Sequence, residues 1–279
     1  PPMTGSASMW IDLVPHLRQL GAVVSVDLPG TIAGHTGAPY RHGPRPDLDA
    51  RFVSAFVRQL RLEYQVVLHG WSMGALAAAL AAGLMPNKIR GVVLVAPALP
   101  WRLTSRVEAL GWQTLGRLAV AAGPPTTRIV LRLAGRRIVD AKRAAIKDAV
   151  SGGRADLVGG DPGRVSRAQV DLWLDGLEAA REHPERLAGT ATAFASIIKA
   201  MFITQRSTNE ALDAVPAPVL VLGGTDDHLI DTTSLLQHAR RPGVRLILLG
   251  PSLQQLRRAA APADHRPLRP ARGDLGPRA

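Results

Sequence analysis

The stretch that decides the fold is YQVVLHGWSMGALAAALAAGLM, which covers residues 64–85. Its first part, YQVVLHG (64–70), is a short apolar run of the kind that forms a buried β-strand. Its last part, MGALAAALAAGLM (73–85), is a helical pattern. Gly70-Trp71-Ser72-Met73-Gly74 joins them, and small residues flanking the serine let the backbone turn tightly. The sequence therefore predicts a strand, a sharp turn that presents the Ser72 hydroxyl, and a helix.

Apolar runs similar to the first part recur along the chain. They are AVVSVDL (22–28), GVVLVAP (91–97), APVLVLGG (217–224) and VRLILLG (244–250). Helical patterns at 6–20, 48–62 and 73–85 alternate with the earlier runs. Apolar strands separated by amphipathic helices are typical of a parallel sheet that is buried on both faces. We therefore predict an α/β fold, with a mostly parallel sheet flanked by helices.

The alternation stops after Pro97 and resumes near Pro216, and the interval between them is helical in character. The last thirty residues are rich in proline, arginine and alanine, a composition typical of disorder. These changes predict four segments: a first part of the core (1–98), a helical cap or lid (99–215), a second part of the core (216–250) and a disordered tail (251–279).

The net charge of +12 is unevenly distributed. Residues 101–150 carry ten basic and three acidic side chains, and residues 240–279 carry nine and two. Neither segment has the interleaved aromatic residues or the motif of a nucleic-acid reader, so we expect no nucleic-acid partner.

Composition also excludes several kinds of site. The chain has no cysteine, which excludes disulfides and thiolate metal sites and favours the cytoplasm. No cluster of histidines and carboxylates has metal-ligand spacing, so we expect neither a metal nor a cofactor. No apolar run reaches the roughly 18 to 20 residues that a membrane span needs.

Together, the turn and its context resemble the α/β-hydrolase superfamily, in its lid-bearing bacterial esterase and lactonase-like branch, over about residues 1–250. Three other stretches support the resemblance. LVLGGTDDHLID (220–231) is similar to the family's acid turn, VVSVDLPGTIAGHTG (23–37) to its D-x-P-G loop, and MTGSASMWIDLVPHL (3–17) to its oxyanion loop.

The resemblance implies a serine hydrolase that acts on a small apolar ester-like substrate, namely a carboxylic ester, lactone or thioester, through an acyl-enzyme. Ser72 would be the nucleophile, and Asp227, or its neighbour Asp226, would orient the histidine base. The backbone N–H groups of Met73 and Met3 would form the oxyanion hole. Apolar lid residues would roof the acyl pocket; they include Trp101, Trp112, Leu115, Ile129, Leu131 and Leu133.

The chain departs from the family pattern at both ends. The family places its histidine directly after the last strand, but here PSLQQLRRAA follows that strand and the only downstream histidine is His265. His265 is therefore the candidate base. The strand that should lead into the oxyanion loop is absent, so the sheet would lack a central member between 22–28 and 65–69. One hypothesis explains both departures: a coding region truncated at its start and frameshifted near residue 250.

Two alternative functions follow from these departures. One is a catalytically impaired or non-catalytic protein of the same fold, which lacks its histidine base and binds a ligand or partner. The other is a cofactor-free haloperoxidase-like perhydrolase, which uses the same catalytic triad of serine, acid and histidine. Fold alone does not decide among the three.

Overall fold

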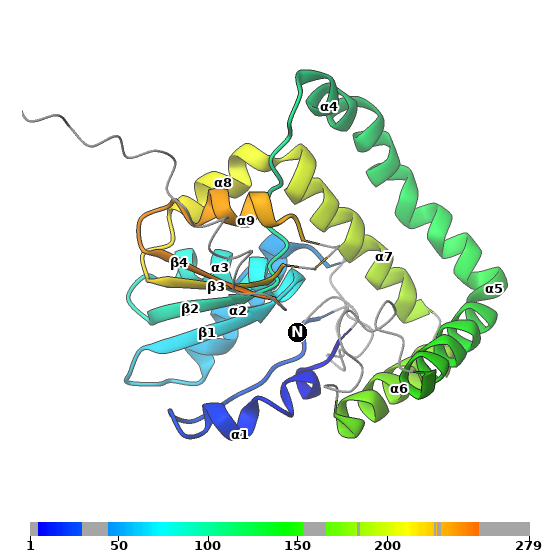
Figure 1. Ribbon diagram of the computed structural model, residues 1–279, viewed down its shortest axis with the longest axis horizontal. Helices are drawn as coiled ribbons and strands as arrows, with labels where there is room; N and C mark the ends of the chain where they lie inside the picture. Colours follow the sequence, from blue (N-terminus) through cyan, green and yellow to red (C-terminus); the bar gives the residue numbers. More distant parts are fainter. Residues whose placement is uncertain are drawn as a thin grey trace, which may run out of the picture. The chain divides into compact units, whose positions relative to one another are not determined.

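The computed structural model describes residues 5–29, 44–152, 166–182, 185–225, 227 and 230–250. The chain divides into two compact units, Pro1–Leu249 and Gly250–Ala279. All elements described below belong to the first unit, and Figure 1 shows their arrangement.

A parallel sheet of four strands forms the centre of this unit. The strands are β1 (Val66–Trp71), β2 (Ile89–Val95), β3 (Val219–Gly224) and β4 (Val244–Leu249), in the order β1-β2-β3-β4 (Figure 1). Val92, Leu94 and Val221 on the two inner strands are at most 2% exposed. The α/β fold with a parallel sheet, predicted from the apolar runs, is confirmed.

Three helices before and between these strands pack against the sheet or against each other. They are α2 (Pro46–Gln59), α3 (Met73–Leu84) and α9 (Thr232–His238). Helix α2 begins with Pro46, whose fixed φ suits a first helical turn. Helix α3 contacts both β1 and β2, and its buried face consists mainly of alanines. Small side chains allow this helix to approach the sheet closely and to begin directly at the turn after β1.

A long helical segment separates β2 from β3 in the chain. It contains α4 (Arg106–Gly111), η2 (Trp112–Gly116), α5 (Arg117–Gly152), α6 (Arg167–Glu182), α7 (Glu185–Ile198), η5 (Lys199–Ile203) and α8 (Gln205–Asp213). We call these elements the inserted helices. In Figure 1, α5 extends away from the sheet while α7 and α8 return toward it.

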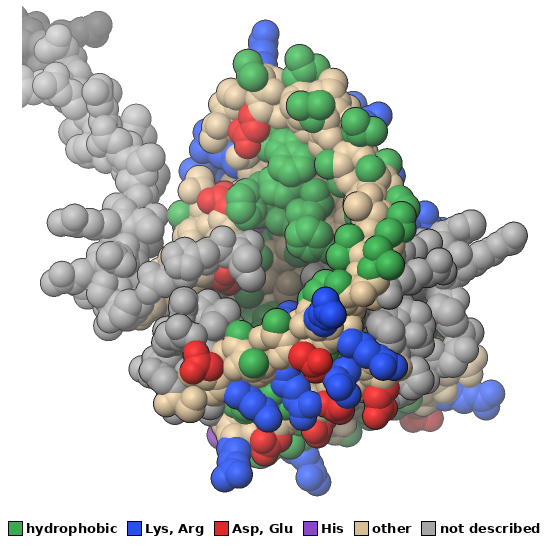
Figure 2. All heavy atoms as spheres, turned by 90° about the vertical axis from the view of Figure 1, so that its right-hand side faces the viewer, with side chains coloured by type: hydrophobic (Ala, Val, Ile, Leu, Met, Phe, Trp, Pro, Cys, Tyr) green, Lys and Arg blue, Asp and Glu red, His purple; other side chains and the backbone are tan. Residues whose placement is uncertain are grey.

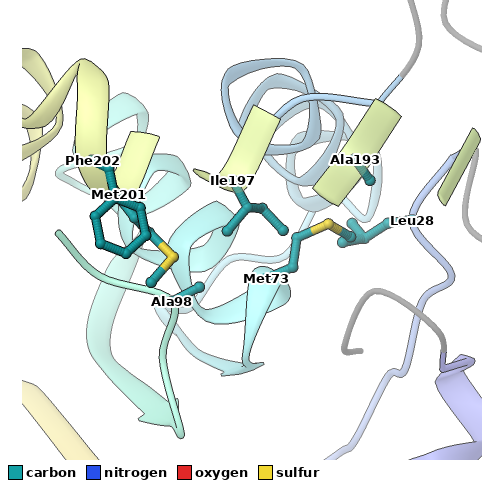
Figure 3. Packing of buried hydrophobic residues seen from close by; sticks show 7 residues of the cluster. All are labelled: Leu28, Met73, Ala98, Ala193, Ile197, Met201 and Phe202. Atoms are coloured by element: carbon teal, nitrogen blue, oxygen red, sulfur yellow. The ribbon is translucent and has the colours of Figure 1, made fainter. Parts of the chain in front are cut away.

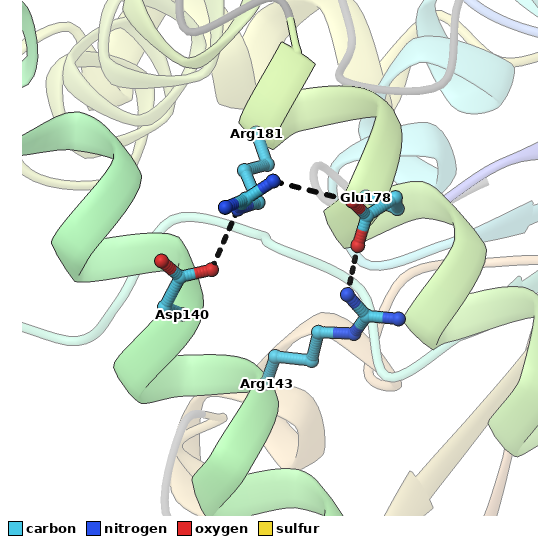
Figure 4. A network of polar contacts seen from close by, with 4 residues as sticks. All are labelled: Asp140, Arg143, Glu178 and Arg181. Atoms are coloured by element: carbon cyan, nitrogen blue, oxygen red, sulfur yellow. Dashed lines mark hydrogen bonds and ion pairs between the residues drawn. The ribbon is translucent and has the colours of Figure 1, made fainter.

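Ion pairs join α5 to α6. Arg181 of α6 contacts Asp140 of α5 at 2.8 Å and Glu178 of its own helix at 3.6 Å. Glu178 in turn accepts a hydrogen bond from Arg143 of α5 (Figure 4). Because each of these side chains is partly exposed, the network contributes modestly to stability and mainly fixes the register of the two helices.

The N-terminal part differs from its predicted structure in two places. The helix expected over 6–20 is instead two short ones, η1 (Ala7–Trp10) and α1 (Val14–Leu17). Pro15 lies in the first turn of α1, where a missing N–H is tolerated, so a new helix starts there. The strand expected over 22–28 is also wrong. These residues pair with no strand of the described sheet. Strand β1 is the edge of that sheet, and no described strand lies between β1 and residues 22–28 to pair with them.

Candidate active site

Ser72 occupies the predicted sharp turn between β1 and α3. Its φ of 54° and ψ of −115° are unusual for a residue with a side chain and store backbone strain. Three backbone hydrogen bonds hold this conformation. The N–H of Ser72 donates to the carbonyl of Val95 (2.9 Å), and its own carbonyl accepts from the N–H groups of Ala75 (3.1 Å) and Ala98 (3.2 Å).

The turn requires a glycine at position 70. A Cβ there would lie 2.4 Å from the carbonyl oxygen of Gly74 and 2.5 Å from Cα of Ala75. Both obstacles are backbone atoms, so no side-chain rotation could relieve the clash. The small residue before the serine is therefore a geometric requirement of the turn, as the sequence pattern predicts.

The side chain of Ser72 is half-buried and does not cap α3. A serine at the start of a helix commonly accepts a hydrogen bond from a first-turn N–H, and this one does not. Its hydroxyl is thus available for another role. Met73 is the first residue of α3, where backbone N–H groups have no acceptor within the helix and carry the positive end of the helix dipole. A developing negative charge beside Ser72 would be stabilised there.

Met73 also anchors the turn through its side chain, which is 1% exposed. It belongs to a buried apolar cluster that we call the site floor (Figure 3), made of Leu28, Met73, Ala98, Ala193, Ile197, Met201 and Phe202. The cluster joins the loop before residue 30, the exit of β2, α7 and η5. Sequence reasoning missed its three members from 197–202, although the apolar run ASIIKAMFI (195–203) was a visible signal.

Aromatic rings connect the site floor to both ends of the inserted helices. Phe202 stacks on Trp112 with ring centroids 4.2 Å apart and meets the edge of Trp101 at 5.2 Å. The backbone N–H of Trp101 donates to the carbonyl of Met201 (3.3 Å), and the side-chain amide of Gln205 donates to the carbonyl of Trp101 (2.6 Å). The start and the end of the insertion are therefore fastened together beside the turn.

Of the six apolar residues expected to roof a pocket, three lie in the protein interior or beside it. Trp101 and Trp112 pack against the site floor, and Leu131 is buried in α5. Leu115, Ile129 and Leu133 are instead exposed. Figure 2 shows a hollow with a hydrophobic floor beneath the arch of the inserted helices.

Asp227 follows β3, and β2 separates that strand from β1. The carboxyl ends of parallel strands share one edge of a sheet, where neighbouring strands lie about 4.8 Å apart. The ends of β1 and β3 are therefore about 10 Å apart, a gap that a histidine between serine and acid could bridge. Asp227 lies close to the strand end, because a Cβ at Gly224 would be 3.5 Å from its Cβ.

The end of β4 lies against the beginning of the acid turn. The N–H of Thr225 donates to the carbonyl of Leu249 at 2.9 Å. Asp226 and His265, two of the sequence-predicted candidates, lie outside the described residues.

The segment that resembles an oxyanion loop also reaches the turn. Trp10 meets the edge of Trp71 with ring centroids 6.3 Å apart. The N–H of Ala7 donates to Asp27, and the Ser25 hydroxyl donates to the carbonyl of Ala7 (2.8 Å). Residues 7–10 are thereby held next to the residue that precedes Ser72, whereas Met3 lies outside the described residues.

Two described histidines have shifted pKa values. Burial lowers the pKa of His69, which lies in β1, and its Nδ1 is buried without a hydrogen-bond partner among the described residues. Burial also lowers the pKa of His238, while a hydrogen bond with the carbonyl of Pro100 (2.9 Å) opposes the shift and Arg241 adds to it. The contacts of His238 with Pro100 and Arg241 give this residue a structural role.

The described residues contain no group of three or more histidine, aspartate or glutamate side chains placed to hold a metal ion. Across the same part of the chain, no helix has the length and apolar character needed to cross a membrane.

Comparison with known proteins agrees with this geometry. The family model described as "Alpha/beta hydrolase family" matches residues 2–273. The chain belongs to the α/β-hydrolase family. No curated protein matches it.

Several solved structures share the fold. One is the N-acyl homoserine lactone degrading enzyme Est816, at 18% identity and a TM-score of 0.55, covering 89% of this chain and 82% of that one. A serine hydrolase from the polyaromatic hydrocarbon-degrading bacterium Cycloclasticus zankles has 14% identity and a TM-score of 0.57, with coverage of 89% and 78%. A thermophilic esterase from Thermogutta terrifontis has 17% identity and a TM-score of 0.51, with coverage of 88% and 77%. At these identities, the likeness concerns the fold of this α/β hydrolase.

Proposed function

We propose that this α/β hydrolase is a serine hydrolase that cleaves small apolar ester-like substrates through an acyl-enzyme. The observation that carries the proposal is the strained backbone of Ser72 at the end of β1, with a hydroxyl that does not cap the helix. A protein maintains such strain where the surrounding structure enforces it, and positions of this kind cluster at active sites.

In the proposed reaction, Ser72 attacks the substrate carbonyl while a histidine takes the hydroxyl proton. The N–H groups of Met73 and Met3 stabilise the oxyanion. The protonated histidine returns its proton to the leaving group, and water then releases the acid from Ser72. Asp227 holds the histidine in position, and His265 is the candidate for that base.

The site floor supports an apolar acyl group as the part of the substrate bound near Ser72. Met73 lies in this cluster directly after the proposed nucleophile, and Ile197 and Phe202 reach it from the inserted helices. We propose that residues 99–215 act as a lid over the acyl group. The solved structures that share this fold include an esterase and an N-acyl homoserine lactone degrading enzyme, which supports an ester-like substrate class here.

A fluorophosphonate probe tests the proposal directly, because it labels only an activated serine. We expect the wild-type chain to be labelled and Ser72→Ala not to be. Ser207→Ala is the matched control, since Ser207 is exposed on α8 and its hydroxyl donates to the carbonyl of Thr204 within the same turn. Labelling that persists in Ser72→Ala would refute the assignment of the nucleophile. No labelling of the wild type would favour the non-catalytic alternative.

Turnover of p-nitrophenyl esters tests the remaining residues. We expect Asp227→Asn and His265→Gln each to lower kcat by a factor of about 10² or more, because each breaks the proton-transfer unit. Asp226→Asn is the control for Asp227→Asn. If the Asp226 variant loses more activity than the Asp227 variant, Asp226 is the acid. If His265→Gln keeps full activity, the base is another residue.

A further inference from the structure

Among the described residues, nine large apolar side chains of the inserted helices are at least 43% exposed, and six of them are more than 60% exposed. We call Val107, Leu110, Leu115, Leu118, Ile129 and Leu133 the apolar stripe; each is between 61% and 83% exposed. Figure 2 shows hydrophobic side chains gathered at the top of the view, where Figure 1 places α4 and the start of α5. Single exposed apolar residues are ordinary, but six strongly exposed ones within residues 107–133 indicate an interaction surface.

The apolar stripe follows one face of the helices. Leu118, Ile129 and Leu133 are separated by eleven and four residues, which correspond to three turns and one turn of an α-helix. Leu131, which lies two residues from both Ile129 and Leu133, is buried on the opposite side of α5, and Val139 is buried further along the helix. Val139 packs on Leu177 and Ala180 of α6. The helix thus uses one face for the protein interior and presents a second apolar face outward.

Basic residues accompany the apolar stripe. Between Arg106 and Ile138 the chain has six arginines and one glutamate. Arg117, Arg136 and Arg137 are exposed. The ion pairs of α5 with α6 involve Asp140 and Arg143, which follow the apolar stripe in the sequence.

The apolar stripe is exposed and lies in a segment with excess positive charge, and these two properties together indicate which kind of surface binds to it. A second copy of the chain would bring two arginine-rich helices together, and their like charges would repel. An anionic lipid surface accepts the apolar side chains and attracts the arginines at the same time. We infer that the apolar stripe of α4, η2 and α5 docks on an anionic lipid surface, with the helices lying along it.

This inference concerns where the protein acts and does not depend on the hydrolase chemistry. It is tested by co-sedimentation of the full chain with lipid vesicles. One set is phosphatidylcholine alone, and the other contains about one-third phosphatidylglycerol, which gives a negative surface. We expect binding to the anionic vesicles that is about tenfold stronger than to the neutral ones and that weakens as salt is raised.

Two variants separate the apolar stripe from the general positive charge of the chain. Leu118→Gln/Leu133→Gln removes two apolar side chains without changing the charge, and we expect it to lower binding about tenfold. Leu20→Gln/Val24→Gln is the matched control, because these residues are also exposed but lie outside the inserted helices. We expect this control to bind as the wild type does. Circular dichroism of each variant checks that the helices are intact.

Three results would overturn the inference. One is no sedimentation with anionic vesicles. Another is equal binding by wild type and Leu118→Gln/Leu133→Gln, which would mean that the basic charge of the whole chain drives binding. The third is a dimer, detected by sedimentation velocity, that this variant abolishes while vesicle binding is absent, which would make the surface an interface between copies.

Discussion

The turn at Ser72 should be highly sensitive to a single added methyl group at Gly70. In Gly70→Ala, the new Cβ would lie 2.4–2.5 Å from backbone atoms of Gly74 and Ala75. Overpacking of this kind usually costs about 1–3 kcal/mol, and the upper part of the range applies because backbone atoms must move. A loss of about 3 kcal/mol lowers the folding equilibrium constant about a hundredfold.

Urea unfolding followed by tryptophan fluorescence measures this loss, and a thermal melt gives a second estimate. For a chain of this size, about 3 kcal/mol corresponds to a decrease in Tm of about 6–12 °C. Labelling by the fluorophosphonate probe should decrease with it, because relief of the clash displaces Ser72.

Gly176→Ala is the matched control, since a Cβ at this position of α6 meets no atom within 4 Å. Alanine in the middle of a helix is favoured over glycine by about 0.5–1 kcal/mol, so we expect slight stabilisation. If Gly70→Ala unfolds at the same urea concentration as the wild type, the turn is not constrained as the structure shows. Destabilisation of both variants alike would also contradict the reasoning, because only one of them has an obstacle.

Three further predictions concern the surroundings of the turn. Burial lowers the pKa of His238 below its ordinary value of 6.5, so the unfolded chain binds this proton more readily than the folded chain does. The stability of the protein should therefore fall as the pH drops below 6.5. Between about pH 7.5 and 5.5, Tm should fall less in His238→Gln than in the wild type. Phe202→Ala should cost about 3–5 kcal/mol in urea unfolding by removing the ring stacked on Trp112, and a loss under about 1 kcal/mol would contradict that packing. Asp231→Ala should cost about 1 kcal/mol in the same assay, because Asp231 accepts from the N–H groups of Thr233 and Ser234 at the start of α9, whereas Asp231→Asn should retain most of the stability.

The central features of the fold could be predicted from the sequence because they depend on local patterns. Four apolar runs became the four strands, and the small residues around Ser72 predicted the turn, since only glycine fits at position 70. The run at 22–28 has the same composition but is not a strand, because pairing depends on a neighbour that its own residues do not specify. The pattern at 6–20 predicts one helix, but Pro15 favours a first helical turn, so α1 starts there as a separate helix.

The contacts between distant segments could not be predicted from the sequence. Met73 contacts Leu28 and Ile197, which belong to different parts of the chain, and no periodicity identifies them as neighbours. The apolar residues Leu115 and Leu133 were expected to face inward, because apolar side chains usually do. The exposure of Leu133 depends on which face of α5 meets α6 and α7, and that of Leu115 on which face of η2 meets η5; both are properties of tertiary packing.

The fastening of Trp101 to Phe202 and Met201 has a consequence for how this protein can diverge. Nearly a hundred residues separate Trp101 from Met201 and Phe202, and these contacts hold the two ends of that segment together at the core. The part of this segment before Ala193 can change in length at small entropic cost, whereas Ala193, Ile197, Met201 and Phe202 must be kept because they pack with Met73 beside Ser72. New substrate specificities can therefore arise by replacing that part of the inserted helices.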